Sequence, residues 1–122
     1  MKAHLHILSV EDQRLYAEMV STLFENAGHT VVTAEDGQEA LDLAAMAKFD
    51  LLVTDHKMPR VDGLVLVMRL KETGFGGKMI VHSSRLSEQE AAFYRRLGVD
   101  LIVMKGPDTE NLVGLTKELF VA

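Results

Sequence analysis

The chain has 122 residues, about the length of one domain, and its 48% hydrophobic and 25% charged residues are ordinary for a globular protein. The net charge of -5 argues against a basic nucleic-acid-binding surface over the chain as a whole, and the lack of cysteine excludes disulfides and thiolate metal sites. We expect neither a membrane span, which needs roughly 18 apolar residues, nor a signal peptide, because acids interrupt the first apolar stretch.

Strand-like and helix-like segments alternate along the whole chain. In chain order the patterns predict a strand at residues 4–10, a helix at 13–27, a strand at 30–34, a helix at 36–48, a strand over 49–55, a helix at 64–70, a strand at 78–83, a helix at 87–97, a strand at 100–104 and a last helix from Asp108 or Thr109. Gly28 favours a left-handed helix end. Capping boxes pair Asp36 with Glu39 and Ser87 with Glu90.

This alternation is typical of an α/β fold with a parallel sheet and right-handed crossovers. The run Leu51 to Val53 is apolar at successive positions, as expected for a strand that is covered on both faces. No Pro- or Gly-rich stretch suggests a linker, so we expect one domain over residues 1–122. Ligands of such sheets bind where the strands end.

Polar side chains stand where four of the predicted strands end: Glu11 and Asp12, Asp55, Ser83 and Ser84, and Lys105. If these ends share one edge of the sheet, the acids repel one another, and a hard divalent cation would relieve that repulsion. Mg²⁺ takes oxygen ligands and often binds through one or two carboxylates together with a phosphate. The set therefore suits phosphoryl chemistry on a carboxylate nucleophile, with a metal and a lysine neutralising the phosphoryl oxygens.

These residues resemble those of a response-regulator receiver domain, similar to CheY. The matching pieces are V-E-D at 10–12, D-L-L-V-T-D-H-K-M-P-R-V-D-G at 50–63, S-S at 83–84 and L-I-V-M-K at 101–105. The most specific piece is Asp-x-x-Met-Pro-x-x-Asp-Gly after an apolar strand. The resemblance covers essentially the whole chain and implies a flavodoxin-like, doubly wound, five-stranded parallel sheet of order 2-1-3-4-5 with five helices.

The resemblance also implies a role for each matching position. Asp55 would accept a phosphoryl group from a phosphohistidine of a sensor histidine kinase or a histidine phosphotransfer protein. Ser83 would reach the aspartyl phosphate, and Lys105, which we expect to be partly hydrated, would pair with it. Mg²⁺ or Mn²⁺ would be held by Glu11, Asp12, Asp55 and the backbone carbonyl of Lys57.

The implied function is that of a cytoplasmic signalling switch rather than an enzyme. Phosphorylation would change a surface that binds an unknown downstream protein, without direct contact to nucleic acid or a membrane. The surface of the fourth helix, fifth strand and fifth helix is also a candidate for a homodimer. We expect either a stand-alone receiver or the N-terminal domain of a longer regulator.

The sequence departs from the family pattern near its end. Ile102 stands where an aromatic residue often changes rotamer on activation, so the usual coupling of that ring to the hydroxyl is in doubt. Gly106 separates Lys105 from Pro107, where a lysine is commonly followed directly by proline. A non-proline cis bond costs roughly 2.5–4 kcal/mol, so we expect a trans bond before Gly106.

Other features of the sequence leave alternatives open. The first strand ends in Glu-Asp where two aspartates are commoner. Lys57 and Arg85 flank the site, where they would either shield the phosphoryl group or extend into solvent. We interpret the other aspartates as caps and turns, the histidines as structural or exposed, and five methionines as core residues: Asp36, Asp50, Asp62, Asp100 and Asp108; His4, His6, His29, His56 and His82; Met19, Met46, Met68, Met79 and Met104.

Two other function classes compete with the switch. A receiver fold kept as a phosphorylation-independent interaction scaffold is the alternative, although the complete acidic, hydroxyl and lysine set argues against it. Enzymes of similar topology fail at named positions. A haloacid-dehalogenase-type phosphatase needs an aspartate at position 57, which is Lys57, and a nucleotide-binding protein needs a Gly-rich loop where residues 11–14 read E-D-Q-R.

Overall fold

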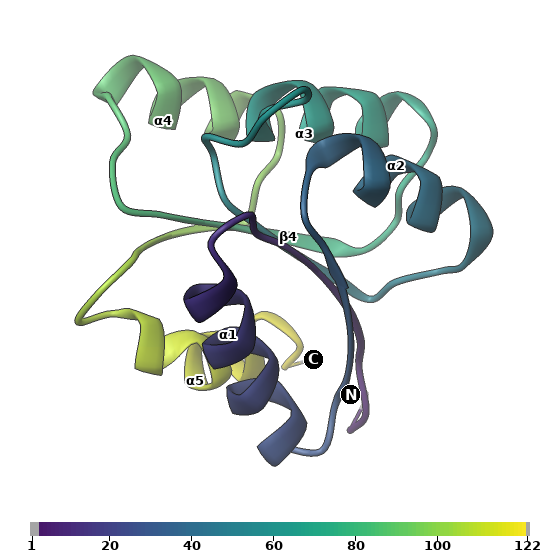
Figure 1. Ribbon diagram of the computed structural model, residues 1–122, viewed down its shortest axis with the longest axis vertical. Coiled ribbons are helices and arrows are strands. Elements are labelled where there is room, and N and C mark those ends of the chain that lie inside the picture. The colour runs from purple at the N-terminus through teal and green to yellow at the C-terminus, as the bar shows by residue number, and fades with distance from the viewer. Residues whose placement is uncertain (1–2, 122) are drawn as a thin grey trace.

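A computed structural model describes residues 3–121 as one parallel sheet with helices on both of its faces (Figure 1). The strands are β1 His6–Val10, β2 Thr30–Ala34, β3 Leu51–Thr54, β4 Lys78–Ser83 and β5 Leu101–Met104, in the spatial order β2-β1-β3-β4-β5. The helices are α1 Arg14–Asn26, α2 Gly37–Met46, α3 Gly63–Glu72, α4 Glu88–Arg96 and α5 Leu112–Leu119, with a 3₁₀ turn at Thr109–Asn111. The predicted fold class and strand order are confirmed.

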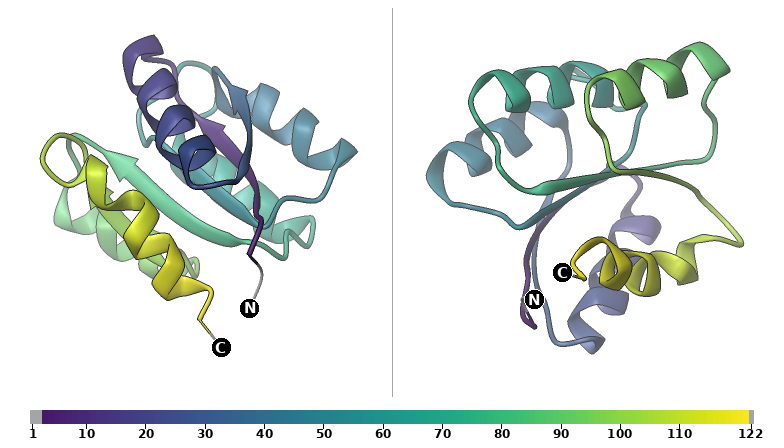
Figure 2. Two further views of the ribbon diagram at one scale, coloured as in Figure 1. Left: turned by 90° about the horizontal axis from the view of Figure 1, so that it is seen from below. Right: turned by 180° about the vertical axis from the view of Figure 1, so that it is seen from behind.

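Two hydrophobic layers sandwich the sheet. Helices α2, α3 and α4 cover one face, and α1 and α5 cover the other (Figures 1 and 2). The central strand β3 feeds both layers, because Leu52 packs into the first while Leu51 and Val53 pack into the second. This double burial explains the continuous apolar run in that strand.

Side-chain caps fix where three of the helices begin. Asp36, Asp62 and Ser87 each accept a hydrogen bond from the backbone N–H three residues later. The capping box of Ser87 and Glu90 is complete, as predicted. The predicted box at Asp36 is only half present, because the Glu39 carboxylate accepts from the N–H of Glu35 instead.

The prediction that five methionines lie in the core was wrong for four of them. Among the five methionines only Met79 lies in the core, while the others are 39% to 82% exposed. Helical spacing identifies a face but not how far the neighbouring layer extends over it, and Met19 lies beyond that edge. The last helical segment begins at Thr109, as predicted, with a 3₁₀ turn that leads directly into α5 at Leu112, and Asp108 lies in the turn before it.

The path after β5 follows the expectation for Gly106. Residues 3–121 contain no cis peptide bond, and Gly106 has a φ of 107°, which favours glycine. Its N–H donates to the Thr109 hydroxyl at 3.0 Å, which closes the loop that follows Lys105. In this described part of the chain no helix is long and apolar enough to cross a membrane.

Candidate functional site

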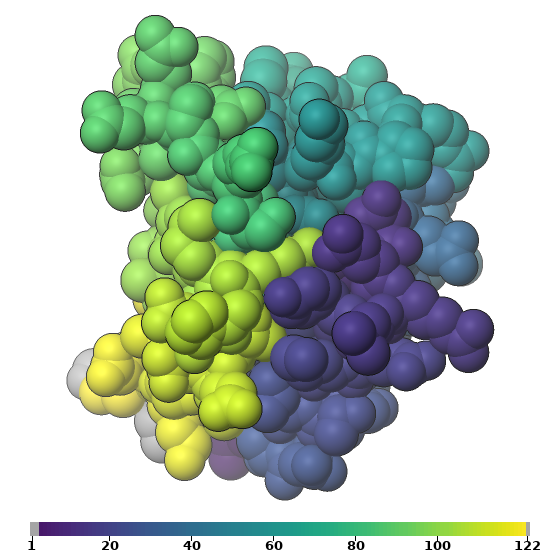
Figure 3. Space-filling model, turned by 60° about the vertical axis from the view of Figure 1, so that its left-hand side comes forward, coloured from purple at the N-terminus to yellow at the C-terminus, as the bar shows by residue number. Residues whose placement is uncertain are grey.

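The carboxyl ends of β1, β3 and β5 bring distant segments together at one edge of the sheet. Backbone hydrogen bonds continue the strand ladders by one residue, since Glu11 N–H donates to Ala34, Asp55 N–H to Val10 and Lys105 N–H to Ser83. The side chains that follow the strands are therefore held by the sheet itself. In Figure 3 the start of α1, in purple, and the segment after β5, in yellow-green, lie against each other on this side of the molecule.

Asp55 is held from two sides. It is 7% exposed, and its Oδ1 accepts the backbone N–H of His56 at 2.8 Å. Its Oδ2 lies 3.0 Å from Nζ of Lys105. These contacts fix the carboxylate while it still lines the open hollow at this edge of the sheet.

Lys105 is more deeply buried than its strand-end position predicted. Its side chain is 2% exposed, so the expected partial hydration was wrong. The ammonium lies 2.8 Å from Oε1 of Glu11 and 3.1 Å from Oε1 of Gln13, and 4.7 Å from the centre of the Tyr16 ring. Burial works against its charge, but the hydrogen bonds to Glu11 and Asp55 outweigh burial and raise the pKa of Lys105.

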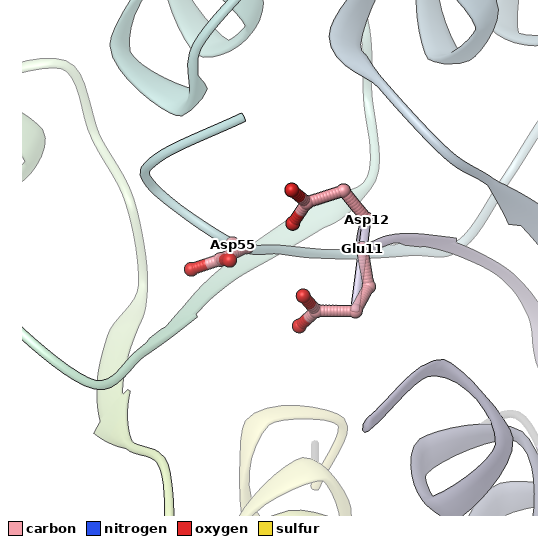
Figure 4. Close-up of side chains that lie close together, drawn as sticks. All are labelled: Glu11, Asp12 and Asp55. Carbon is pink, nitrogen blue, oxygen red and sulfur yellow. The ribbon is translucent and has the colours of Figure 1, made fainter. Parts of the chain in front are cut away.

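The three acids converge on one small region (Figure 4). Carboxylate oxygens of Glu11, Asp12 and Asp55 lie within 4.8 Å of one another, one from each residue. Burial raises the pKa of Glu11 to about 7, the neighbouring Asp55 adds to this, and Lys105 offsets it only in part. Asp12 is exposed and makes no hydrogen bond or ion pair with the residues that the structure describes. This oxygen-rich, mutually repelling set fits a hard divalent cation.

The remaining predicted site residues lie around the same hollow, which has a volume of about 940 Å³. Ser83 is 3% exposed, and its hydroxyl donates to the carbonyl of Arg85 at 3.2 Å. Lys57 and Arg85 are exposed at the rim, and neither forms an ion pair with Asp55. This exposure agrees with the solvent-directed interpretation of both cations.

Sequence reasoning missed two residues at the start of α1 that contact the Lys105 ammonium: Gln13 at the N-cap position and Tyr16 in the first turn. The sequence placed both residues only within the helix predicted at residues 13–27. Their signal was available: Gln13 directly follows Glu11 and Asp12, and the helix that begins there must pass the end of the sheet. Together they surround the ammonium with an amide oxygen and a ring face, which stabilise a buried cation.

The histidines are structural or exposed, as expected, and none joins the metal-type cluster found among residues 3–121. His82 is 2% exposed, and its Nε2 lies 2.9 Å from the Thr109 hydroxyl. Burial lowers its pKa to about 4, so it packs as a neutral ring. His56 is buried beside Asp55 and contacts α4.

The family model of the response regulator receiver domain matches residues 7–117. The chain belongs to this family. The response regulator MprA of Mycolicibacterium vanbaalenii is 34% identical over 115 residues, which are 94% of this chain and 50% of the relative. This receiver chain spans half or less of the length of the curated relatives it matches.

Solved receiver structures show the same fold. The chemotaxis protein CheY4 of Vibrio cholerae has a TM-score of 0.86 and 27% identity, with 97% of this chain and 100% of that chain covered. The response regulator protein TrrA of Thermotoga maritima, solved in complex with Mg²⁺ and BeF, has a TM-score of 0.83 and 25% identity, with 94% and 98% covered. The CheY-like resemblance of the sequence is therefore confirmed.

Proposed function

We propose that this receiver domain is a phosphoacceptor switch in which Asp55 takes a phosphoryl group from a phosphohistidine of a sensor kinase or phosphotransfer protein. The observation that carries the proposal is the geometry of Asp55. Its Oδ1 is held by the His56 amide and its Oδ2 faces the Lys105 ammonium, beside two further carboxylates. A structural carboxylate needs no such acidic neighbours.

The transfer step follows from this arrangement. A carboxylate oxygen of Asp55 attacks phosphorus, the phosphorus–nitrogen bond of the donor breaks, and its electron pair returns to the donor imidazole. Lys105 is within reach to pair with a phosphoryl oxygen, since its Nζ already lies 3.0 Å from Oδ2. The chain thereby acts as a signalling phosphoacceptor rather than as an enzyme with a separate substrate.

The acids are proposed to hold Mg²⁺ or Mn²⁺. Glu11, Asp12 and Asp55 would supply carboxylate oxygens and Lys57 its backbone carbonyl. The bound cation would neutralise charge on the phosphoryl oxygens. What supports this is the convergence of the carboxylates within 4.8 Å and the presence of Mg²⁺ in the structure of TrrA.

Phosphorylation would then change a protein-binding surface in the cytoplasm. Ser83 lies at the end of β4 and would turn from the Arg85 carbonyl toward the phosphoryl group. We expect residues 84–97 to respond, with little reorientation of the half-buried Ile102, which is stiffer at χ1 than an aromatic ring. The downstream protein and a homodimer through α4, β5 and α5 belong to the same proposal.

Labelling with acetyl phosphate tests this function. In the presence of Mg²⁺ the intact protein should gain the mass of one phosphoryl group, and omission of the metal should abolish the gain. Asp55→Asn should take no label. Asp50→Asn is a matched control, because it removes a carboxylate at the opposite end of the same strand. Equal labelling of wild type and Asp55→Asn would refute the proposal.

A further inference from the structure

Helix α4 holds the residue that directly follows the proposed phosphoacceptor. His56 is 9% exposed; its Nδ1 lies 2.6 Å from the hydroxyl of Tyr94, and its Nε2 lies 2.8 Å from Oε2 of Glu90. The rings of His56 and Tyr94 meet edge to face at 5.5 Å. Glu90 and Tyr94 are four residues apart and so share one face of the helix. One helix therefore binds both ring nitrogens.

The donors and acceptors of this contact can be assigned. The Glu90 carboxylate only accepts, so the Nε2–H of His56 donates to it. In the uncharged tautomer with its proton on Nε2, the lone pair is at Nδ1, which accepts the hydroxyl proton of Tyr94. Burial raises the pKa of Tyr94, so the hydroxyl keeps that proton. The hydrogen bonds therefore run from Tyr94 through His56 to Glu90, and each of these three side chains has a hydrogen-bond partner.

Glu90 and His56 make further hydrogen bonds, which connect this contact to the cap of α4 and to Asp55. The second oxygen of Glu90, Oε1, accepts the N–H of Ser87 at 2.9 Å and completes the cap of α4. The backbone N–H of His56 donates to Oδ1 of Asp55 at 2.8 Å. A single residue thus touches the phosphoacceptor through its backbone and the first turns of α4 through its ring.

A glycine at the start of α3 leaves room for this contact. A Cβ atom at position 63 would collide with the hydroxyl of Tyr94, and the N–H of Gly63 donates to the carbonyl of His56 at 2.7 Å. Helix α3 therefore anchors the histidine backbone and leaves space for the tyrosine hydroxyl to reach the ring. Segments after β3, at the start of α3 and on α4 all contribute to the arrangement.

We propose that His56 is a positioning residue that couples Asp55 to helix α4, so that phosphorylation changes the contacts of its ring with Glu90 and Tyr94. The proposal rests on the phosphoacceptor function proposed above. Forming the acyl phosphate converts the charged acceptor of the His56 N–H into a weaker, neutral one. This route needs no aromatic ring at position 102, where the chain has Ile102.

Two substitutions remove hydrogen bonds between His56 and α4 while keeping an aromatic ring at each position. Tyr94→Phe deletes the hydroxyl and His56→Phe deletes both ring nitrogens. The readout is amide exchange of residues 88–96 with Mg²⁺ alone and with Mg²⁺ plus beryllofluoride, a phosphoryl mimic. In wild type the mimic should change the exchange rates. In Tyr94→Phe that change should shrink about two- to tenfold, the factor that one lost hydrogen bond carries, and in His56→Phe, which loses two, it should shrink at least as much.

Ser87→Ala is the matched control, because it removes the other side-chain cap of α4 and leaves His56 untouched. It should raise basal exchange at the start of α4 but keep the response to the mimic. Each protein is also labelled with acetyl phosphate. Wild type without label would overturn the proposed function and the coupling together. Labelled wild type with the same response in Tyr94→Phe and His56→Phe, or a response lost equally in Ser87→Ala, would overturn the coupling alone.

Discussion

Aspartates lie at both ends of the strands, but their contacts differ between the amino ends and the carboxyl ends. At the amino ends Asp50 accepts the N–H of His6 and Asp100 accepts the N–H of Met79, each at 2.8 Å. Each of these carboxylates therefore bonds a backbone donor at the start of a neighbouring strand. Each carboxylate thereby adds a hydrogen bond between two segments whose strands are already paired in the sheet.

At the carboxyl ends the acids face one another instead. Glu11, Asp12 and Asp55 converge, and the ammonium of Lys105 bonds only two of them. Burial raises the pKa of Glu11, and the nearby charge of Asp55 raises it further. An aspartate before a strand therefore bonds the backbone of a neighbouring strand, whereas the acids after the strands face one another beside one lysine, as the proposed cation and phosphoryl site requires.

The largest effect on stability should come from removing the lysine at the carboxyl ends. Lys105→Met leaves Glu11 and Asp55 buried without their cation, and breaking a buried pair in this way costs about 3 kcal/mol. Urea unfolding should show this loss, and added Mg²⁺ should recover part of it. Lys57→Met is the control, because its exposed side chain should change the free energy by less than about 0.5 kcal/mol. An unchanged midpoint in Lys105→Met would contradict the buried arrangement.

The pH dependence of the unfolding free energy also distinguishes the acids at the carboxyl ends of the strands from the aspartates at the amino ends. The folded pKa of Glu11, about 7, exceeds its ordinary value of 4.5, so the folded state holds the proton more tightly. This residue's contribution to stability is therefore full below about pH 4.5 and is lost as the pH rises through 7.

Unfolding free energies of the metal-free protein between these pH values should fall less steeply in Glu11→Gln than in wild type. Asp100→Asn serves as the comparison at the amino ends and should keep the wild-type slope. Parallel curves for Glu11→Gln and wild type would show that Glu11 is not the titrating group.

The smallest effect should come from the amino ends. Asp100→Ala removes one hydrogen bond to the Met79 N–H and should lower the free energy of unfolding by about 1 kcal/mol. Acetyl phosphate labelling and Mg²⁺ affinity should stay at wild-type values, because this carboxylate lies at the opposite end of the strands. A labelling defect in Asp100→Ala would erase the functional distinction between the two ends.

Strand ends were predictable from the sequence because a buried parallel strand is an apolar run with a sharp polar end. Once β3 and β5 were located, Asp55 and Lys105 had to follow at the same edge of the sheet. The burial of Lys105 was not predictable in this way. It depends on Gln13 and Tyr16, whose approach is set by the packing of α1 rather than by any strand pattern.

The helices show the same limit. Spacing located the helices, yet it assigned Met46 to the core although that residue is 82% exposed. The contact of His56 with Glu90 and Tyr94 also escaped prediction, because it joins a strand end to a helix face that lies over 30 residues away in sequence. Local patterns define the elements, and contacts between elements need the packed structure.

The stability gained from Mg²⁺ tests the account most directly. A ligand that binds only the folded state raises the free energy of unfolding with its concentration. Wild type should gain stability on Mg²⁺ addition, Asp100→Asn should gain as much, and Asp12→Asn should gain little while being at least as stable as wild type without metal. An equal gain in wild type and Asp12→Asn, or none in wild type, would contradict a cation site built from repelling acids at the carboxyl ends of the strands.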